Sequence, residues 1–292
     1  MTVTEAKRIV RDYFQDDHVS EEEEFVFTEA VKYLIEETKD PDYMNDLGAY
    51  YYGKKQYDLA LKYYELAAEY GNRYAISNLG YIWYYGRTGT KDYEKAFHYY
   101  ERAKEMGDLV AAYKLADMYR NGYHVEKNDD KYREIIEDLY TRVIDADNLD
   151  APVPEVFTRL AKIRSEEGKE EEALALYDRA RDFLAVRIMY NPFFGNLNIM
   201  KWMIDDIYAI RVPDKDRLDL YDLYKLLQTP AKVEYRYEKK RYVVESHMEE
   251  GGCAILFADK WYRSTDDFFQ KAKIDGELLT SLYEELHGFK EV

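Results

Sequence analysis

The sequence predicts a mainly α protein, an α-solenoid of helical hairpin repeats followed by a small α+β domain with a three-stranded antiparallel sheet. Two observations carry this prediction. The segment from Tyr43 to Asp108 contains nearly the same pattern twice, and an internal period of about 30 to 50 residues is typical of repeat arrays. After Pro230, apolar residues recur at about every second position, as expected where helices give way to strands. The expected domains are N-terminal capping helices at 1–41, repeats at 42–190, capping helices at 191–230 and the α+β domain at 231–292.

The composition indicates a folded, strongly acidic chain. Of the 292 residues, 47% are hydrophobic, which suffices for packed cores. The 59 acidic and 42 basic residues give a net charge of −17, and this charge disfavours binding to nucleic acid or to an anionic membrane surface. We therefore expect protein or peptide partners that are basic, neutral or rich in aromatic residues.

The compartment is suggested by features that the sequence lacks. Cys253 is the single cysteine, so no disulfide can form within the chain, and a reducing compartment is favoured. The N-terminal residues contain no apolar core of a secretory signal. No window approaches the ~20 apolar residues of a membrane span. These features predict a cytoplasmic protein.

Two helices are expected before the repeats. Residues 4–15 have apolar side chains on one helical face. Ser20 and Glu23 then form the pattern of a capping box, and negative charge at Glu21 to Glu24 suits a helix N-terminus. This acidic run is therefore interpreted as a helix start and not as a binding tail. The second helix is expected to end before Pro41.

The repeats align on a leucine followed by glycine or alanine. Small residues let two antiparallel helices approach closely, and stacking of neighbouring hairpins covers the face that one hairpin leaves bare. The second copy carries four extra residues around Arg87 to Lys91. The aligned positions are Leu47, Ala60, Tyr64 and Ala67 in the first copy, Leu79, Ala96, Tyr100 and Ala103 in the second, and Leu160, Ala173, Tyr177 and Ala180 in the fourth. The third copy begins at Leu115 but is degraded in its second helix, with Tyr132, Ile136 and Leu139 at the aligned positions.

These motifs resemble a known class of repeat. The pattern Leu79-Gly80-x-x-Trp83-x-x-Gly86, followed by Ala96 and Tyr100, is similar to a Sel-one-like repeat (SLR). The shorter copies resemble the related tetratricopeptide repeat (TPR). The resemblance covers about residues 42 to 182 and does not extend to the C-terminal 62 residues.

The resemblance implies a binding groove, because the first helix of each tetratricopeptide hairpin lines a concave surface. The implied groove residues are Asn45 and Tyr52 in the first copy, Ser77, Tyr81, Tyr84 and Tyr85 in the second, and Tyr113, Asp117 and Arg120 in the third. Such an aromatic surface suits a peptide backbone with apolar side chains. The alternative is that these tyrosines only pack between helices. The family's carboxylate clamp is not present at these positions, which disfavours an adaptor for chaperone tails.

The last segments are expected to cap the solenoid and then form a sheet. Two helical stripes, from Leu197 to Ile207 and from Leu218 to Leu227, predict helices that cover the final repeat. Strands are expected around 233–237, 242–244 and 253–257, the last of them central because both its faces are apolar. Helices are expected around 265–271 and 276–285.

Catalytic, metal and cofactor sites are not predicted. The five histidines, His18, His98, His124, His247 and His287, lack the spacing of a zinc site. The group His247, Glu249, Glu250 and Cys253 beside Gly251 and Gly252 could in principle hold a metal or an activated thiol, but a lone cysteine that starts an alternating strand is more often buried.

The sequence thus favours a non-enzymatic scaffold or adaptor that binds a protein or peptide in the aromatic groove. The alternative is an acidic inhibitor or immunity-type protein that blocks a basic toxin or nuclease, since charge complementarity speeds association with a cationic target. An enzyme centred on Cys253 is the least favoured hypothesis. Oligomeric state does not follow from these patterns.

Overall fold

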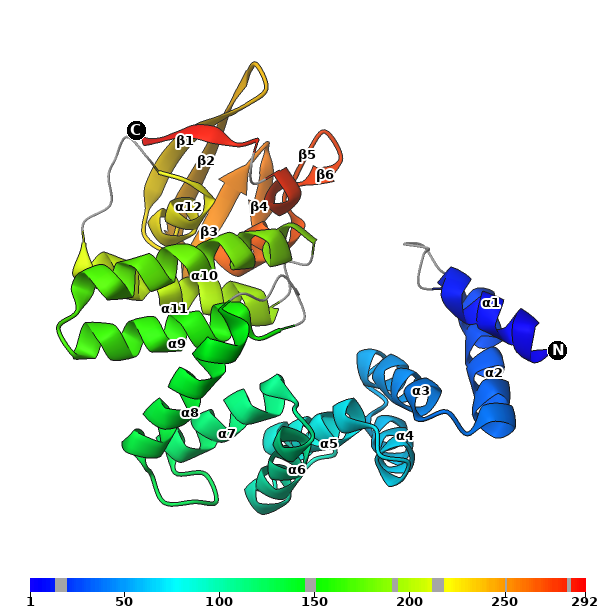
Figure 1. Cartoon of the computed structure of the whole chain (residues 1–292). Coiled ribbons are helices and arrows are strands. Elements are labelled where there is room, and N and C mark those ends of the chain that lie inside the picture. Colours follow the sequence, from blue (N-terminus) through cyan, green and yellow to red (C-terminus); the bar gives the residue numbers. More distant parts are fainter. Residues whose placement is uncertain (14–19, 145–150, 191–193, 212–217, 250, 283–284) are drawn as a thin grey trace. The chain divides into compact units, whose positions relative to one another are not determined.

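The computed structural model describes residues 1–13, 20–144, 151–190, 194–211, 218–249, 251–282 and 285–292. The chain divides into two compact units, Met1–Ile135 and Ile136–Val292, whose elements are labelled in Figure 1. Helix α8, Asp129–Val143, runs across the boundary between them. The predicted fold class, a helical-repeat solenoid followed by a small α+β domain, is confirmed.

The first unit is built from helical hairpins (Figure 1). Helix α1 packs on α2, α3 on α4 and α5 on α6, and successive hairpins contact each other through α2 and α3, α4 and α5, and α6 and α7. Each hairpin therefore covers the apolar face of its neighbour, as expected for a repeat array. The helices are α1 Val3–Tyr13, α2 Glu21–Thr38, α3 Pro41–Gly53, α4 Tyr57–Glu69, α5 Arg73–Tyr85, α6 Tyr93–Glu105 and α7 Leu109–Asn121.

The predicted start of α2 is confirmed. The backbone N–H of Glu23 donates to the hydroxyl of Ser20 at 3.3 Å, and the backbone N–H of Ser20 donates to the carboxylate of Glu23 at 2.8 Å. This reciprocal pair satisfies two donors that the helix itself leaves free. The second half of the expected helix at 4–15 lies partly outside the described residues, because residues 14–19 are not among them.

Capping residues also tie one hairpin to the next. Buried Asn72 caps α5 through its side-chain oxygen, and its Nδ2 donates to Asp42 of α3 at 2.8 Å. Buried Asp108 caps α7 in the same way and accepts a hydrogen bond from Ser77 of α5 at 3.3 Å. Each cap therefore satisfies a helix end and fixes the stacking of two repeats.

The Leu-Gly motif permits close packing inside each hairpin. A Cβ at Gly48 would lie 2.6 Å from the ring of Tyr64, and a Cβ at Gly80 would lie 2.6 Å from the ring of Tyr100. Such separations are shorter than any ordinary carbon contact. The glycines thus let the two tyrosine rings lie directly against the opposite helix, which confirms the role expected for small residues.

After α8, the second unit continues with a hairpin of two helices, α9 Val153–Glu166 and α10 Glu170–Tyr190. Two further helices follow, α11 Phe194–Ile210 and α12 Leu220–Leu226. Helix α10 packs on α9 and on α11. The aligned residues of the fourth copy, Leu160, Ala173, Tyr177 and Ala180, are all buried. The two helices expected after residue 190 are present as α11 and α12, whereas the stop expected at Asn191 and Pro192 lies outside the described residues.

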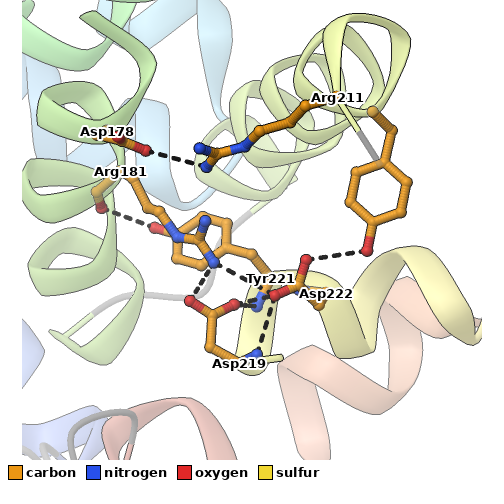
Figure 2. Close-up of polar contacts among 7 residues, drawn as sticks. Asp178, Arg181, Arg211, Asp219, Tyr221 and Asp222 are labelled. Carbon is orange, nitrogen blue, oxygen red and sulfur yellow. Dashed lines mark hydrogen bonds and ion pairs between the residues drawn. The ribbon is translucent and has the colours of Figure 1, made fainter. Parts of the chain in front are cut away.

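A buried polar network holds the start of α12 against α10, as Figure 2 shows. The guanidinium of Arg181 on α10 donates to Asp219, the N-cap of α12, and lies 3.6 Å from Asp222. The hydroxyl of Tyr208 on α11 donates to Asp222 at 2.9 Å. The hydroxyl of Tyr221 donates back to the carbonyl of Arg181 at 2.9 Å. Three helices are therefore joined through one guanidinium and two carboxylates.

The C-terminal sheet has five strands, so the prediction of three is wrong. Their order is β4-β3-β2-β1-β7, all antiparallel. The strand expected at 253–257 is β3, an interior strand between β2 and the edge strand β4, whereas β2 occupies the middle of the sheet. The two strands that were missed are short edge strands, in which no alternating pattern has room to develop. The strands are β1 Ala231–Tyr237, β2 Lys240–Glu249, β3 Gly252–Phe257, β4 Lys260–Tyr262 and β7 His287–Glu291.

The helix at 265–271 is confirmed as α13, Thr265–Lys271, but the helix at 276–285 is wrong. Asp275 and Gly276 both have positive φ, 51° and 98°, and they turn β5, Lys273–Ile274, into β6, Glu277–Leu278. A short 3₁₀ helix, Leu279–Leu282, follows. Two successive left-handed residues form a hairpin turn and cannot begin a helix.

Candidate partner-binding surface

Tyrosine rings form a continuous cluster on the second and neighbouring hairpins. Tyr52 of α3 contacts Tyr81 of α5 edge to face, with ring centroids 5.9 Å apart. Tyr81 lies 4.4 Å from Tyr85, which lies 4.9 Å from Tyr84. Such geometries are favourable for aromatic pairs. We call this set the tyrosine cluster, and its members are Tyr52, Tyr57, Tyr81, Tyr84, Tyr85, Tyr93 and Tyr123.

Arg87 lies among four rings of the tyrosine cluster. Its guanidinium carbon is 5.2 Å from the ring centroid of Tyr85 and 5.7 Å from that of Tyr81. It is also 5.8 Å from the centroid of Tyr52 and 5.9 Å from that of Tyr57, both from the preceding hairpin. All four distances are within the range of a cation–π interaction. Arg87 belongs to the four-residue insertion of the second copy, so the insertion supplies the cation that links two repeats.

Lys114 of α7 supplies a second cation to the tyrosine cluster. Its ammonium donates to the hydroxyl of Tyr85 at 3.2 Å. It also lies 5.7 Å from the ring centroids of Tyr81 and Tyr84 and 5.4 Å from that of Tyr113. Sequence reasoning did not identify Arg87 or Lys114 as site residues. The position of Arg87 inside the insertion was the one available signal, and no pattern indicated Lys114.

Burial raises the pKa of two phenols of the tyrosine cluster. Desolvation raises the pKa of Tyr52 and of Tyr84 well above the usual range, although the charge of Arg87 opposes the rise at Tyr52. The pKa of buried Tyr100, directly beneath the cluster, is raised for the same reason. At neutral pH Tyr52, Tyr84 and Tyr100 therefore carry uncharged hydroxyl groups, which can donate or accept hydrogen bonds.

The predicted groove residues differ in accessibility. Tyr85 is 37% exposed, and Tyr52, Tyr81 and Tyr84 are half-buried, so the second copy presents most of the aromatic surface. The remaining predicted residues are Asn45 and Arg120, both half-buried, and Ser77, Tyr113 and Asp117, which are only 7 to 8% exposed.

Three of these remaining residues contact side chains of other helices or of a helix cap. Ser77 donates to the cap residue Asp108. Asn45 accepts a hydrogen bond from Asn78 at 3.2 Å. The guanidinium of Arg120 lies 5.3 Å from the ring centroid of Tyr132. The structure thus brings the tyrosines of the first two copies together, while Ser77, Asn45 and Arg120 make contacts between helices.

Cys253 and His247 are not placed to form the metal site or activated thiol that the sequence raised as a possibility. Cys253 is buried and its thiol lies 3.4 Å from the carbonyl oxygen of Gln228. In the sheet, His247 is paired with Ala254, the next residue after Cys253, so the imidazole and the thiol belong to opposite faces. His247 instead lies 3.4 Å from Glu245. Glu250 and His18 are outside the described residues.

The described residues were also considered as a metal site and as a membrane span, and they provide neither. Within them, three or more His, Cys, Asp or Glu side chains never come together in a way that could hold a metal ion. A helix of the length and apolarity that crossing a membrane would need is likewise not found among them.

Comparison with known families identifies the repeats. The Sel1 repeat model matches residues 41–72, 73–108 and 109–131. Residues 41–131 are Sel1 repeats. The first two Sel1 repeats contain the α3–α4 and α5–α6 hairpins, and the third ends early in α8. The tyrosine cluster therefore lies within the Sel1 repeats, and the match does not include the fourth hairpin, α9–α10.

Solved structures with similar repeats include three that illustrate the likeness. A Sel1 repeat protein from Oxalobacter formigenes is 28% identical, with a TM-score of 0.35 over 38% of this chain and 86% of that chain. A protective antigen of uropathogenic Escherichia coli with an SLR fold is 18% identical, with a TM-score of 0.45 over 68% of this chain and 47% of that one. A protein with nearly identical TPR-like repeats from Podosopora anserina is 15% identical, with a TM-score of 0.40 over 63% and 95% of the two chains. A comparison with curated proteins found no match.

Proposed function

We propose that this chain is a non-catalytic interaction module that binds a protein or peptide segment on the tyrosine cluster. Sel1 and TPR-like repeats typically mediate protein–protein interaction. The proposal adds which surface of this chain makes the contact. It is supported by one observation above all: an exposed edge of the cluster at Tyr85 is continuous with half-buried Tyr81 and Tyr84.

The tyrosine cluster has the properties of a preorganised binding surface. Arg87 and Lys114 both contact the rings of Tyr81 and Tyr85, so little side-chain entropy would be lost when a partner binds. Tyrosine combines a large apolar face with a polar tip, which suits contacts with both side chains and backbone of a bound segment. A rigid aromatic patch of this kind resembles the buried centre of many protein interfaces.

The test is affinity capture of partners from native lysate, with the wild-type chain and a Tyr81→Ala, Tyr85→Ala double variant. We expect proteins captured by the wild type to be lost from the double variant. Tyr74→Ala is the matched control, because Tyr74 is also on α5 and is 52% exposed but is outside the cluster. Circular dichroism should show all variants folded. The proposal fails if folded double variant captures the same proteins in the same amounts as the control.

A further inference from the structure

A hollow opens beside the tyrosine cluster, between the first turn of α4 and the insertion that follows α5. It has a volume of about 400 Å³. Both walls belong to the first unit and come from the turns of consecutive hairpins, α3–α4 and α5–α6. Its lining residues are Lys55, Gln56, Tyr57, Asp58, Leu59, Arg87 and Thr88.

The charges of this hollow differ from those of the chain as a whole. Lys55 and Arg87 supply two positive charges, against one negative charge from Asp58. Among the ion pairs within the described residues, none involves Lys55 or Arg87. The hollow is therefore locally cationic, although the chain carries a net charge of −17.

Arg87 is fixed in the wall of the hollow without a carboxylate partner. Its guanidinium carbon lies 5.2 to 5.9 Å from four tyrosine ring centroids, and its side chain is hydrogen-bonded to the phenols of Tyr81 and Tyr52. Its Nε is buried with no hydrogen-bond acceptor among the described residues. Ring faces and neutral phenols stabilise a cation but do not neutralise its charge. An arginine held in this way retains the capacity to attract an anion, and its planar guanidinium suits a carboxylate in particular.

Building on the function proposed above, we propose that the hollow receives the carboxylate of a glutamate or aspartate from the bound protein segment. Lys55 and Arg87 attract the carboxylate by charge complementarity. Tyr57 and Leu59, which is 39% exposed, offer apolar contacts to the methylene groups of that side chain. The partner segment is therefore acidic, in contrast to the basic partners expected from the net charge. A basic side chain would instead meet two like charges.

The test uses two fluorescent synthetic peptides and the full chain. One peptide alternates glutamate with leucine, and its counterpart has glutamine in place of every glutamate. We expect the glutamate peptide to bind at least about tenfold more tightly by fluorescence anisotropy, as charge-assisted contacts allow. Its affinity should also fall as salt rises from low to physiological concentration, because salt screens exposed charges. Equal affinity of the two peptides would overturn the proposal.

Three glutamine substitutions locate the effect. Lys55→Gln and Arg87→Gln should each reduce the affinity for the glutamate peptide about tenfold. Lys62→Gln, which removes the same charge from α4 outside the hollow, should leave it unchanged. Lys55 is exposed, so its substitution tests the proposal even if Arg87→Gln impairs folding. An equal loss in all three variants would show a general charge effect and overturn the assignment of the hollow.

The outcome separates this inference from the proposed function. If capture of a lysate partner depends on Tyr81 and Tyr85 but is unaffected by Lys55→Gln, the tyrosine cluster binds the partner. The proposal that the hollow binds an acidic side chain of that partner is then wrong. If the glutamate peptide binds through Lys55 while the tyrosine double variant still captures its partners, the hollow is an anion site and the cluster is not the contact surface.

Discussion

A Cβ at Gly80 of α5 would lie 2.6 Å from Cε1 of Tyr100 on α6. The same relationship recurs one hairpin earlier, between Gly48 and Tyr64. Both tyrosines are buried, and Tyr100 also lies beneath Tyr84 of the tyrosine cluster, with ring centroids 6.3 Å apart. The glycine of the Leu-Gly motif thus sets the depth at which the tyrosine lies, and through it the position of the cluster.

We predict that Gly80→Ala destabilises the first unit by about 1 to 3 kcal/mol, because the added methyl group must displace a buried ring. Gly48→Ala should have a similar cost. Urea unfolding followed by circular dichroism measures both. Gly53→Ala is the control, since Gly53 is also helical and has nothing within 4 Å of its Cβ position. It should leave stability unchanged or raise it by up to about 1 kcal/mol. An equal effect of all three substitutions would contradict the packing argument.

Arg87→Met should weaken the link between the first two Sel1 repeats. The substitution keeps much of the side-chain volume but removes the cation from four tyrosine rings, at an expected cost of about 1 to 2 kcal/mol in unfolding free energy. Arg87→Lys should recover only part of this loss, because an ammonium group lacks the planar face of a guanidinium. Thermal unfolding of the three proteins checks the order of stability. A methionine variant as stable as wild type would show that the cation contributes nothing.

Arg181→Met should destabilise the second unit strongly. The arginine side chain is 16% exposed and that of Asp222 is 8% exposed, and removal of one partner from a buried ion pair costs about 3 to 5 kcal/mol. Burial and the charge of Asp219 already raise the pKa of Asp222, whereas Arg181 opposes this rise. Without Arg181 the pKa should rise further. The cost of Arg181→Met in unfolding free energy should then fall as the pH is lowered from neutral and the protonated fraction of Asp222 increases.

Arg211→Met is the matched control for this prediction, because Figure 2 shows Arg211 in a second ion pair of the same region. Arg211 lies 3.5 Å from Asp178, and both side chains are about half exposed. Exposed pairs contribute about 0 to 1 kcal/mol. Denaturant unfolding at two pH values compares the variants. If Arg181→Met and Arg211→Met lower the free energy of unfolding by the same amount, the buried ion pairs of Arg181 do not stabilise the second unit more than an exposed pair does.

Tyr50 should be an indicator of alkaline unfolding. Burial and the charge of Glu24 raise its pKa to about 12, and its hydroxyl donates to Glu24 at 3.3 Å. A raised pKa favours the folded state while the phenol is neutral. This contribution is complete below the ordinary tyrosine pKa of about 10 and is lost as the pH rises through about 12.

Ultraviolet titration of tyrosinate in the folded protein measures this transition. Tyr50→Phe should reduce the absorbance change near pH 12 by the contribution of one tyrosine and should retain more of its stability at that pH. A Tyr50→Phe variant with the same titration curve and the same alkaline stability as wild type would exclude this assignment.

Features that depend on neighbouring residues could be predicted well. The capping box of Ser20 and Glu23 follows from a spacing of three residues, and the buried role of Tyr64 and Tyr100 follows from their recurrence in the repeats. Short segments were harder to predict. Strand β4, Lys260–Tyr262, has three residues and pairs only with β3, so its existence depends on a partner strand and not on its own pattern.

The sequence by itself determined the helical repeats, the capping box of the helix before them and the change to a sheet, because these features are set by interactions over a few residues and by a period that recurs along the chain. Only the tertiary structure decided what the insertion of the second copy does. Arg87 lies between Tyr81 and Tyr85 of its own hairpin and Tyr52 and Tyr57 of the previous one. That contact exists because stacked hairpins bring residues of different repeats together, and a local pattern carries no information about which side chains then meet.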